Sequence, residues 1–410
     1  MSRAHVDPGD LEAVRRAVGL DEDGSRLHDV GLRRIGIGPD ALDELPAVVD
    51  GLRRPGPIAI VADTVTIQRA GVDAKEAVAE RLAALEPGVT VIRLGEPGMP
   101  LHADAEAIEA AVAGATGCGC LVSVGSGTIC DIGKEASRLL GVPYVVVQTA
   151  NSVNAFSDDM AVLLVNGVKR TMPSRWPDAL VVDLGLVRDA PPILNRAGVG
   201  ELAAMYTAPA DWRLASAFGM DDTFDRRVVD LFRDGRDELV SAAPRASDPD
   251  DAAQRTLAEL MTLSGLALGI AGRTAPISGT EHTVSHLLEM AAAQEGRPAG
   301  LHGAQVGVAA LAVAVAWDRV LATLDPERLL ATPVPSDETM RARTDDAFDW
   351  LDPSGAMADE CWSQYRRKLV RWRERRAGLR ALVDGWGDLR EELRTWAAPA
   401  ATVAGVLGSS

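Results

Sequence analysis

Cysteines and long apolar runs are both scarce in this chain. Four cysteines among 410 residues, with no secretory leader before them, do not make a disulfide framework, so we expect reduced thiols. Cys118 and Cys120 lie in the strand-like stretch GCGCLVSVG, which predicts small buried side chains rather than a metal site. No segment approaches the roughly 20 consecutive apolar residues of a membrane-spanning helix, and the start MSRAHVDPGD lacks the apolar stretch of a signal peptide. We therefore expect a cytoplasmic protein with no membrane partner.

Positive charge is also in short supply. Lysine and arginine number 42 against 59 aspartates and glutamates, which gives a net charge of −17. Such a chain repels the phosphates of nucleic acids, so we predict no nucleic-acid partner. The length and the 47% hydrophobic content predict two domains with full cores. They are compatible with a homo-oligomer without specifying one.

Strand-like and helix-like runs alternate over the first half of the chain. Apolar runs of strand length occur at 33–38, 57–63, 89–95, 120–127 and 143–149, and helical spacing between them includes 73–85 and 104–113. This alternation predicts a parallel α/β domain. After 181–183 the strand-like runs stop and helical spacing dominates. We expect an α/β domain over 1–188 and an all-α domain over 189–410, with the first thirty residues as an extra helix or arm.

A glycine turn follows one of these strand-like runs, in the segment VSVGSGTICDIGK at 122–134. Gly125 and Gly127 would let backbone N–H groups approach an anion, and the start of the next helix adds partial positive charge. The turn lacks both the third glycine of the common dinucleotide fingerprint and the GK[ST] ending of a P-loop. Phosphate binding and an ordinary strand-to-helix turn are equally good interpretations of this segment alone.

Three of the six histidines fall within 21 residues, at His282, His286 and His302. His282 and His286 are four apart in a helix-like run, which places both rings on one helix face. A catalytic zinc-type site needs three nitrogen or oxygen ligands and one open position. The carboxylate ligand is ambiguous from these residues alone. Glu281 and Glu289 are nearby candidates, and Glu201 is a third, in a segment over 197–201 whose glycines, Gly198 and Gly200, predict a turn.

Six segments, read in order, are GSGTICDIGK, PYVVVQTANS, NGVKRTMPSRWPDALVVD, AGVGELAAMYTAPADWRLA, SGTEHTVSHLLEM and LHGAQVGV. Together, over residues 34–320, they resemble the glycerol-1-phosphate dehydrogenase branch of the iron-containing alcohol dehydrogenase and dehydroquinate synthase superfamily. The resemblance implies a Rossmann-like nucleotide-binding N-terminal domain, a helical metal- and substrate-binding domain, and an active site in the cleft between them. It also implies a metal-dependent, NAD(P)-linked dehydrogenase acting on a small polyol, ketose or glycerol-phosphate-like substrate.

Carried over position by position, the resemblance implies that Glu201, His282 and His302 hold a divalent metal, for which we expect zinc. His286 takes the place of a catalytic histidine near nicotinamide and substrate, and an imidazole suits proton transfer because its ordinary pKa lies near neutrality. Glu201 stands where the related dehydrogenases usually have Asp and where dehydroquinate synthases have Glu.

The nucleotide is implied to bind along the glycine turn and the segment after the next strand-like run. The residues at the matching positions are Gly125, Ser126, Gly127, Thr128, Asp131, Thr149 and Ser152. Asp63, at the end of the run PIAIVAD, takes the place of the acidic residue that bonds the adenosine ribose and repels a 2′-phosphate. We therefore expect NAD in preference to NADP.

The substrate end of the cleft is implied to include Asn154, Asn166, Lys169 and Arg170. An ordinary polar β-turn at Asn166-Gly is an almost equal alternative for that segment. Asn154 stands where the related dehydrogenases tend to have Asp, and Ala304 where they have Glu. Two further functions stay open: a dehydroquinate-synthase-like sugar-phosphate cyclase that uses NAD transiently, and a non-catalytic nucleotide-binding homologue. The scarcity of lysines argues against the cyclase, which must hold a phosphate.

Overall fold

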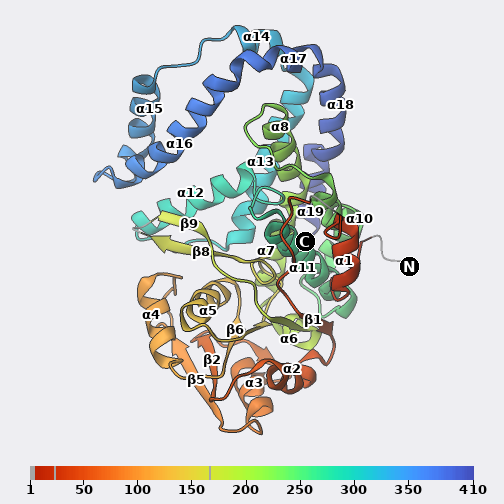
Figure 1. The fold of residues 1–410 in the computed structure, drawn as a ribbon, viewed down its shortest axis with the longest axis vertical. Coiled ribbons are helices and arrows are strands. Elements are labelled where there is room, and N and C mark those ends of the chain that lie inside the picture. The colour runs from red at the N-terminus through yellow and green to blue at the C-terminus, as the bar shows by residue number, and fades with distance from the viewer. Residues whose placement is uncertain (1–4, 23–24, 166–167) are drawn as a thin grey trace.

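A six-stranded parallel sheet forms the centre of the first half of the molecule. The computed structural model describes residues 5–22, 25–165 and 168–410. The strand order is β1-β10-β7-β6-β2-β5, and the sheet half lies below the helical half in Figure 1. The strands are β1 (Arg34–Gly38), β2 (Ile58–Asp63), β5 (Val89–Leu94), β6 (Cys120–Gly125), β7 (Tyr144–Gln148) and β10 (Ala179–Asp183). The strands expected from the apolar runs and the α/β class are therefore confirmed.

The sheet is buried on both faces, which explains why its strands are continuous apolar runs. Alternate residues of each strand enter different cores: Ala59 and Val61 pack on one side, Ile58 and Ile60 on the other. The first core includes helices α4 (Ala105–Gly114) and α5 (Gly127–Leu140). The second includes η1 (Ala41–Glu44), α2 (Leu45–Leu52) and α3 (Ala74–Leu82).

The direction of winding reverses at β2. From β2 the chain moves outward to the edge strand β5, and then returns to β6 on the opposite side of β2. Loops leaving the carboxyl ends of β2 and β6 therefore diverge, and such a switch point is where open α/β sheets bind ligands. The two ends are Asp63 and Gly125, so the topology places the expected ribose carboxylate and the glycine turn at the same edge.

Two antiparallel hairpins accompany the sheet and were not expected from the sequence. β3 (Gln68–Arg69) pairs with β4 (Val72–Asp73), and β8 (Met160–Val165) pairs with β9 (Val168–Pro173). The β8–β9 hairpin reaches toward α12 of the helical half, where Val168 packs against the buried cluster of Ala291, Leu351 and Met357. Asn166, one of the predicted substrate residues, lies outside the described residues.

Every described element after β10 is helical, as the spacing predicts. The elements are α6 (Leu184–Asp189), α7 (Pro192–Leu202), η2 (Ala203–Tyr206), α8 (Ala208–Ala217), α9 (Arg226–Arg233), α10 (Arg236–Ala242), η3 (Ala243–Arg245), α11 (Asp251–Ala271), α12 (Thr280–Gln294), α13 (His302–Thr323), α14 (Pro326–Ala331), α15 (Asp337–Asp349), α16 (Ala356–Arg375), η4 (Arg376–Gly378), α17 (Leu379–Asp384), α18 (Trp386–Trp396) and α19 (Ala400–Ser409). By length and composition α13 alone among the described helices could span a membrane, but it packs against α7, α12 and α19, as a core helix does. The domain boundary at 188/189 falls inside α6 and stays a prediction.

The segment 197–201, interpreted from its glycines as a turn, is helical and belongs to α7. A Cβ on Gly198 would lie 1.8 Å from the carbonyl oxygen of Asn151, and one on Gly200 would lie 2.2 Å from that of Gly303. These glycines therefore allow close packing between segments and do not reverse the chain. Gly198 faces the backbone of Asn151, and Gly200 brings α7 directly against the first turn of α13.

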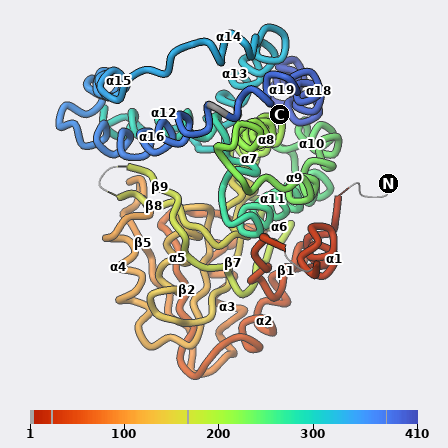
Figure 2. Tube along the Cα trace, turned by 45° about the horizontal axis from the view of Figure 1, so that its top comes forward, coloured from red at the N-terminus to blue at the C-terminus, as the bar shows by residue number. Residues whose placement is uncertain are grey.

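The N-terminal arm packs against the helical half. Helix α1 (Leu11–Val18) lies beside α9 (Figure 2). Glu22 forms an ion pair with Arg227, and the backbone N–H of His28 donates to the carbonyl of Ile270 at 2.8 Å. The expectation of an extra helix is confirmed.

Candidate metal and nucleotide site

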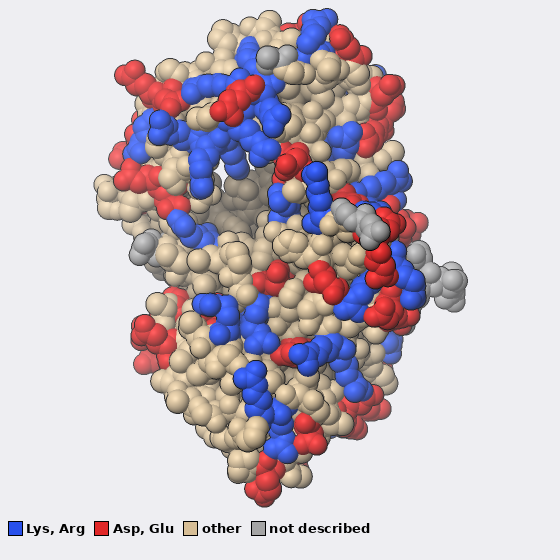
Figure 3. Space-filling view, in the orientation of Figure 1, with Lys and Arg blue, Asp and Glu red and all other residues tan. Residues whose placement is uncertain are grey.

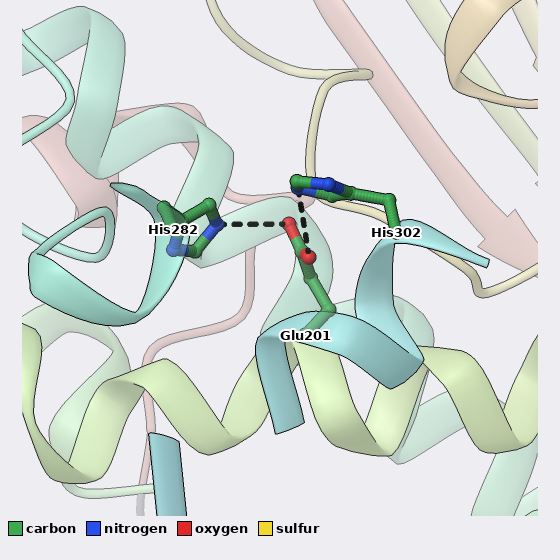
Figure 4. Close-up of side chains that lie close together, drawn as sticks. All are labelled: Glu201, His282 and His302. Atoms are coloured by element: carbon green, nitrogen blue, oxygen red, sulfur yellow. Dashed lines mark ion pairs between the residues drawn. The ribbon is translucent and has the colours of Figure 1, made fainter. Parts of the chain in front are cut away.

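The three predicted metal ligands lie together although they come from three different helices. Glu201 stands near the end of α7, His282 in the first turn of α12, and His302 at the start of α13. One ligand atom from each lies within 4.8 Å of the others. Nε2 of His282 and Nε2 of His302 each lie 3.7 Å from a different oxygen of Glu201 (Figure 4).

This cluster suits a divalent cation. Glu201 is only 2% exposed, and its Oε2 has no hydrogen-bond partner among the described residues. Burial alone would raise the pKa of Glu201, but His302 and His282 outweigh it and hold the pKa below its usual range. An ionised, buried carboxylate facing two imidazoles provides the nitrogen and oxygen donors of a catalytic zinc site.

Glu281 and Glu289, the two alternative ligands, lie behind the histidines. Oε1 of Glu281 lies 3.1 Å from Nδ1 of His282, and Oε1 of Glu289 lies 2.7 Å from Nδ1 of His302. A carboxylate at Nδ1 keeps a proton on that nitrogen, so Nε2 is the nitrogen that can give up its proton to a cation. Both histidines therefore present the nitrogen that faces Glu201 as a ligand atom.

Glu289 also connects the two halves of the molecule. Its second oxygen forms an ion pair with Lys169 of β9, which lies on the sheet side of the cleft. Burial would raise the pKa of Glu289, but the His302 hydrogen bond and Lys169 lower it to about 2. The charge of Lys169, a predicted substrate residue, is thus already engaged. The role of Glu289 as a bridge could not be seen from its position in the sequence.

His286 lies one turn after His282, as its spacing predicts, and lines the cavity. Its ring stacks on that of His302 with centroids 5.5 Å apart. Burial, followed by His302 and His282, lowers its pKa to about 4. This imidazole is therefore neutral near pH 7 and has the capacity to accept a proton.

The glycine turn ends β6 and begins α5. A Cβ on Gly125 would lie 2.6 Å from Cβ of Ile129, and one on Gly127 would lie 2.8 Å from Cγ2 of Val153, so both positions require glycine for close packing. Ser126 precedes α5 without capping it, and its hydroxyl instead bonds that of Ser152 at 2.6 Å. The first N–H groups of α5 are consequently available to an anion.

Buried polar atoms without partners lie close to this turn. Oδ1 of Asp131 and Oγ1 of Thr149 have no hydrogen-bond partner among the described residues, as ligand-binding groups often lack one. Burial raises the pKa of Asp131 to about 7, although Lys134 opposes the shift. Lys134 is fully buried and bonds Asp158 and the carbonyl of Ala155, so it holds the chain beside the turn rather than facing a ligand.

One continuous cleft joins the glycine turn to the histidine cluster. A cavity of about 160 Å³ is lined by the three predicted ligands, His286, Asp131 and Asn154. A second cavity of about 400 Å³ includes Ser126 and Ser152. The two cavities share Gly127, Thr128, Lys169 and His302. His102 also lines both, and no motif in the sequence indicated it.

Four of the predicted residues that the structure describes line neither cavity: Gly125 and Thr149, which lie beside the glycine turn, and Asp63 and Arg170. Asp63 is at the switch point, 3.8 Å from the ammonium of Lys75, but lines neither cavity. Arg170 points away from Lys169, as successive residues of a strand do, and pairs with Glu360 of α16.

The fold resembles solved structures of alcohol and glycerol dehydrogenases. A probable glycerol dehydrogenase from Sinorhizobium meliloti 1021 superposes with a TM-score of 0.55 at 22% identity, over 71% of this chain and 77% of that one. An alcohol dehydrogenase from an archaeal halo-thermophile of a Red Sea brine pool gives the same TM-score at 14% identity, over 93% of this chain and 98% of that one. These likenesses confirm the predicted two-part fold.

The sequence comparisons identify the family. Residues 36–191 match the iron-containing alcohol dehydrogenase family. The glycerol-1-phosphate dehydrogenase [NAD(P)+] of Bacillus licheniformis is 30% identical over 309 residues, which cover 73% of this chain and 74% of that protein. The enzyme of the same name from Methanothrix thermoacetophila is 35% identical over 188 residues, 46% of this chain and 52% of that protein. The chain therefore belongs to the glycerol-1-phosphate dehydrogenase branch of the iron-containing alcohol dehydrogenase family, and the predicted class of enzyme, a dehydrogenase, is confirmed.

Proposed function

We propose that this chain is a zinc- and NAD-dependent dehydrogenase that interconverts the ketone and secondary-alcohol forms of a small glycerol-phosphate-like compound. The observation that carries the proposal is the meeting of Glu201, His282 and His302 at one end of a cleft whose other end is the glycine turn. Relatives named glycerol-1-phosphate dehydrogenase [NAD(P)+] support the nicotinamide cofactor and the phosphorylated triose. Asp63 at the switch point supports NAD over NADP.

Each end of the cleft has a distinct task in this proposal. A divalent cation on the three ligands would supply Lewis acidity to the reacting oxygen, and bound nicotinamide would supply or accept the hydride. The N–H groups at the start of α5 hold the pyrophosphate, and Asp131 and Thr149 offer unpaired atoms to the nucleotide. Asn154 faces the reactant from the cavity wall, and neutral His286 passes the proton.

Removing single histidines tests these roles. We expect His282→Ala and His302→Ala to lose bound zinc and the reduction of dihydroxyacetone phosphate by NADH, while NADH binding remains, because the glycine turn belongs to another part of the cleft. We expect His286→Gln to keep zinc and to lower kcat by about 10²-fold, the usual contribution of a general acid–base group. The measurements are metal analysis, NADH fluorescence titration and steady-state rates.

The three variants together decide between roles. Full zinc content in both alanine variants would refute the ligand assignment. Zinc loss in His286→Gln would make this residue a fourth ligand instead of a proton carrier. Turnover without net NADH consumption by the wild-type enzyme would favour the cyclase.

A further inference from the structure

Helix α16 is a local exception to the acidic balance of the chain, and the prediction from net charge overlooked it. Its last ten residues and the adjoining position, 366–376, include seven basic residues and one glutamate. Figure 3 shows lysine and arginine atoms gathered around the upper edge of a hollow, where Figure 1 places α16.

One side of α16 presents three of these residues in a row. Arg367, Arg371 and Arg375 are four residues apart, so they share a helix face. Among the described residues no carboxylate lies within ion-pair distance of any of the three, and we call them the arginine row. Two other arginines of the helix, Arg366 and Arg373, instead pair with Asp337 of α15.

The arginine row is fixed between two contacts. At one end Glu360, seven residues before Arg367, pairs with Arg170 of β9. At the other end Nε of Arg371 donates to the carbonyl of Gly219 at 3.1 Å, and Arg375 packs against the same glycine. Glu360 and Arg371 are separated by about 16 Å along the helix, so α16 crosses the space between β9 and the segment that follows α8.

Both contacts are next to residues that line the metal end of the cleft. Lys169 and Thr171, on either side of Arg170, line the cavity. On the opposite side Asp221 pairs with Arg273 at 2.8 Å, and Thr274, the next residue, lines the same cavity. The arginine row therefore spans the gap between two segments whose neighbours line the metal end of the cleft, and it borders the opening of the hollow seen in Figure 3.

Inside that cavity, the positive charge of the lining residues already has a carboxylate partner. Lys169 is the one lysine or arginine among the lining residues, and Glu289 neutralises it. Three exposed or half-exposed cations without carboxylate partners at the opening, on a chain of net charge −17, form a positive field at one place. A field of this kind raises the local concentration of anions and falls off within a Debye length of about 10 Å at 0.1 M salt.

We propose that the arginine row of α16 attracts the phosphate of an anionic substrate to the metal end of the cleft. This inference rests on the proposed function, because it takes the reactant of that site to be a phosphate ester. The row acts on binding and not on hydride transfer, so it makes the enzyme selective for charged over neutral trioses.

The test compares adjacent arginines of one helix in the zinc-loaded enzyme with NADH bound, so that glycerol 1-phosphate binds without reacting. Arg367→Gln and Arg367→Gln/Arg375→Gln remove charge from the row, and Arg366→Gln, at the neighbouring position but turned toward Asp337, is the matched control. We expect the double variant to weaken the Kd for glycerol 1-phosphate, measured by calorimetry, by about tenfold in 20 mM NaCl and by less than about threefold in 300 mM NaCl. The control should stay within about twofold at both salt concentrations, and so should kcat with dihydroxyacetone phosphate.

The outcomes separate the two proposals. An unchanged Kd in the double variant, an equal loss in the control, or no binding of glycerol 1-phosphate by the wild-type enzyme would overturn the arginine row as the anion-attracting element. If the wild-type enzyme reduces neutral dihydroxyacetone with NADH, the proposed dehydrogenase survives such a result. Salt-dependent binding that is lost in the double variant, with no turnover of any triose, would instead sustain the row and refute the proposed function.

Discussion

Each imidazole of the metal cluster uses its two nitrogens for different partners. Nε2 faces Glu201, and Nδ1 faces a glutamate of α12: Glu281 for His282 and Glu289 for His302. The hydroxyl of Thr207 donates to Glu281 at 2.8 Å, and that of Ser285 lies 3.2 Å from Nδ1 of His302. The ring orientations are therefore set before any cation binds, which reduces the cost of organising the site.

Glu289→Gln should weaken zinc binding. The amide keeps one oxygen for His302 but loses the negative charge that favours its Nδ1–H tautomer and the partner of Lys169. Loss of such an outer partner typically costs about 10–100-fold in metal affinity. We expect a rise of this size in the zinc Kd, measured by competition with a chelating dye. Glu295→Gln, just past the end of the same helix, is the control, and an equal Kd in both variants would contradict the role of Glu289.

Residue chemistry in the sequence identified the histidines but not their partners. Three histidines within 21 residues are unusual enough to be noticed, whereas glutamates are common along the chain. Which glutamate faces Nε2 and which faces Nδ1 depends on how α7, α12 and α13 cross, and the spacing of residues within one helix carries no such information. The choice of Glu201 accordingly came from the family resemblance.

At the scale of elements, the site depends on the close packing of α7 against α13. Gly200 precedes the ligand Glu201, and Gly303 follows the ligand His302. The Cα of Gly200 lies 2.8 Å from the place of a Cβ on Gly307, one turn further along α13. Glycines on both helices thus let two ligands from distant parts of the chain approach each other.

Gly200→Ala should force these helices apart. The new Cβ would lie 2.2 Å from the carbonyl oxygen of Gly303, which is backbone and has little freedom to move. We expect a loss of about 1–3 kcal/mol in the free energy of unfolding, as for other overpacked cores, together with weaker zinc binding. Urea unfolding of the zinc-free protein measures the first effect and dye competition the second.

A matched control for this substitution lies in α18. Gly387 is helical too, but a Cβ there meets no atom within 4 Å. Gly387→Ala should be neutral or stabilise by up to about 1 kcal/mol, because alanine favours the helix. Equal stability of Gly200→Ala and wild type would show that α7 and α13 can separate freely.

Among the elements, the sequence predicted the strands of the sheet correctly but not the helical conformation of 197–201 or the β8–β9 hairpin. The continuous apolar strands of the sheet were found because burial on both faces leaves a local signal. Gly198 and Gly200 indicated a turn because the sequence alone does not distinguish a glycine needed for chain reversal from one needed for helix contact. The β8–β9 hairpin was missed as a pair of strands because its half-buried residues give a weak pattern, although Asn166-Gly was recognised as a turn candidate.

At the scale of the whole molecule, charge is distributed unevenly. The net charge of −17 does not reveal the basic residues of α16, which border the hollow seen in Figure 3. A sum over the chain cannot show this, because attraction of a ligand depends on local and not on total charge. The prediction of a small-molecule partner remains compatible with the basic helix.

His5 connects the N-terminal arm to two helices that are distant in the sequence, α10 and α11. Its ring is buried, Nδ1 pairs with Glu238 of α10, and Nε2 lies 3.2 Å from Glu259 of α11. A histidine with a carboxylate at both nitrogens must carry both protons to donate to them. Burial lowers its pKa, but Glu259 and Glu238 outweigh burial and raise the pKa above 6.5.

The contact of the N-terminal arm with α10 and α11 should therefore weaken as pH rises. A raised folded-state pKa means that the stabilisation by His5 is complete below pH 6.5, the unfolded value, and is lost as pH rises through the higher folded value. We expect His5→Gln to reduce the free energy of urea unfolding most at pH 6 and least at pH 9. Because every other titrating group is common to both proteins, the difference between wild type and variant isolates His5. A difference that stays constant over this range would mean that the pKa of His5 is the same in the folded and the unfolded protein.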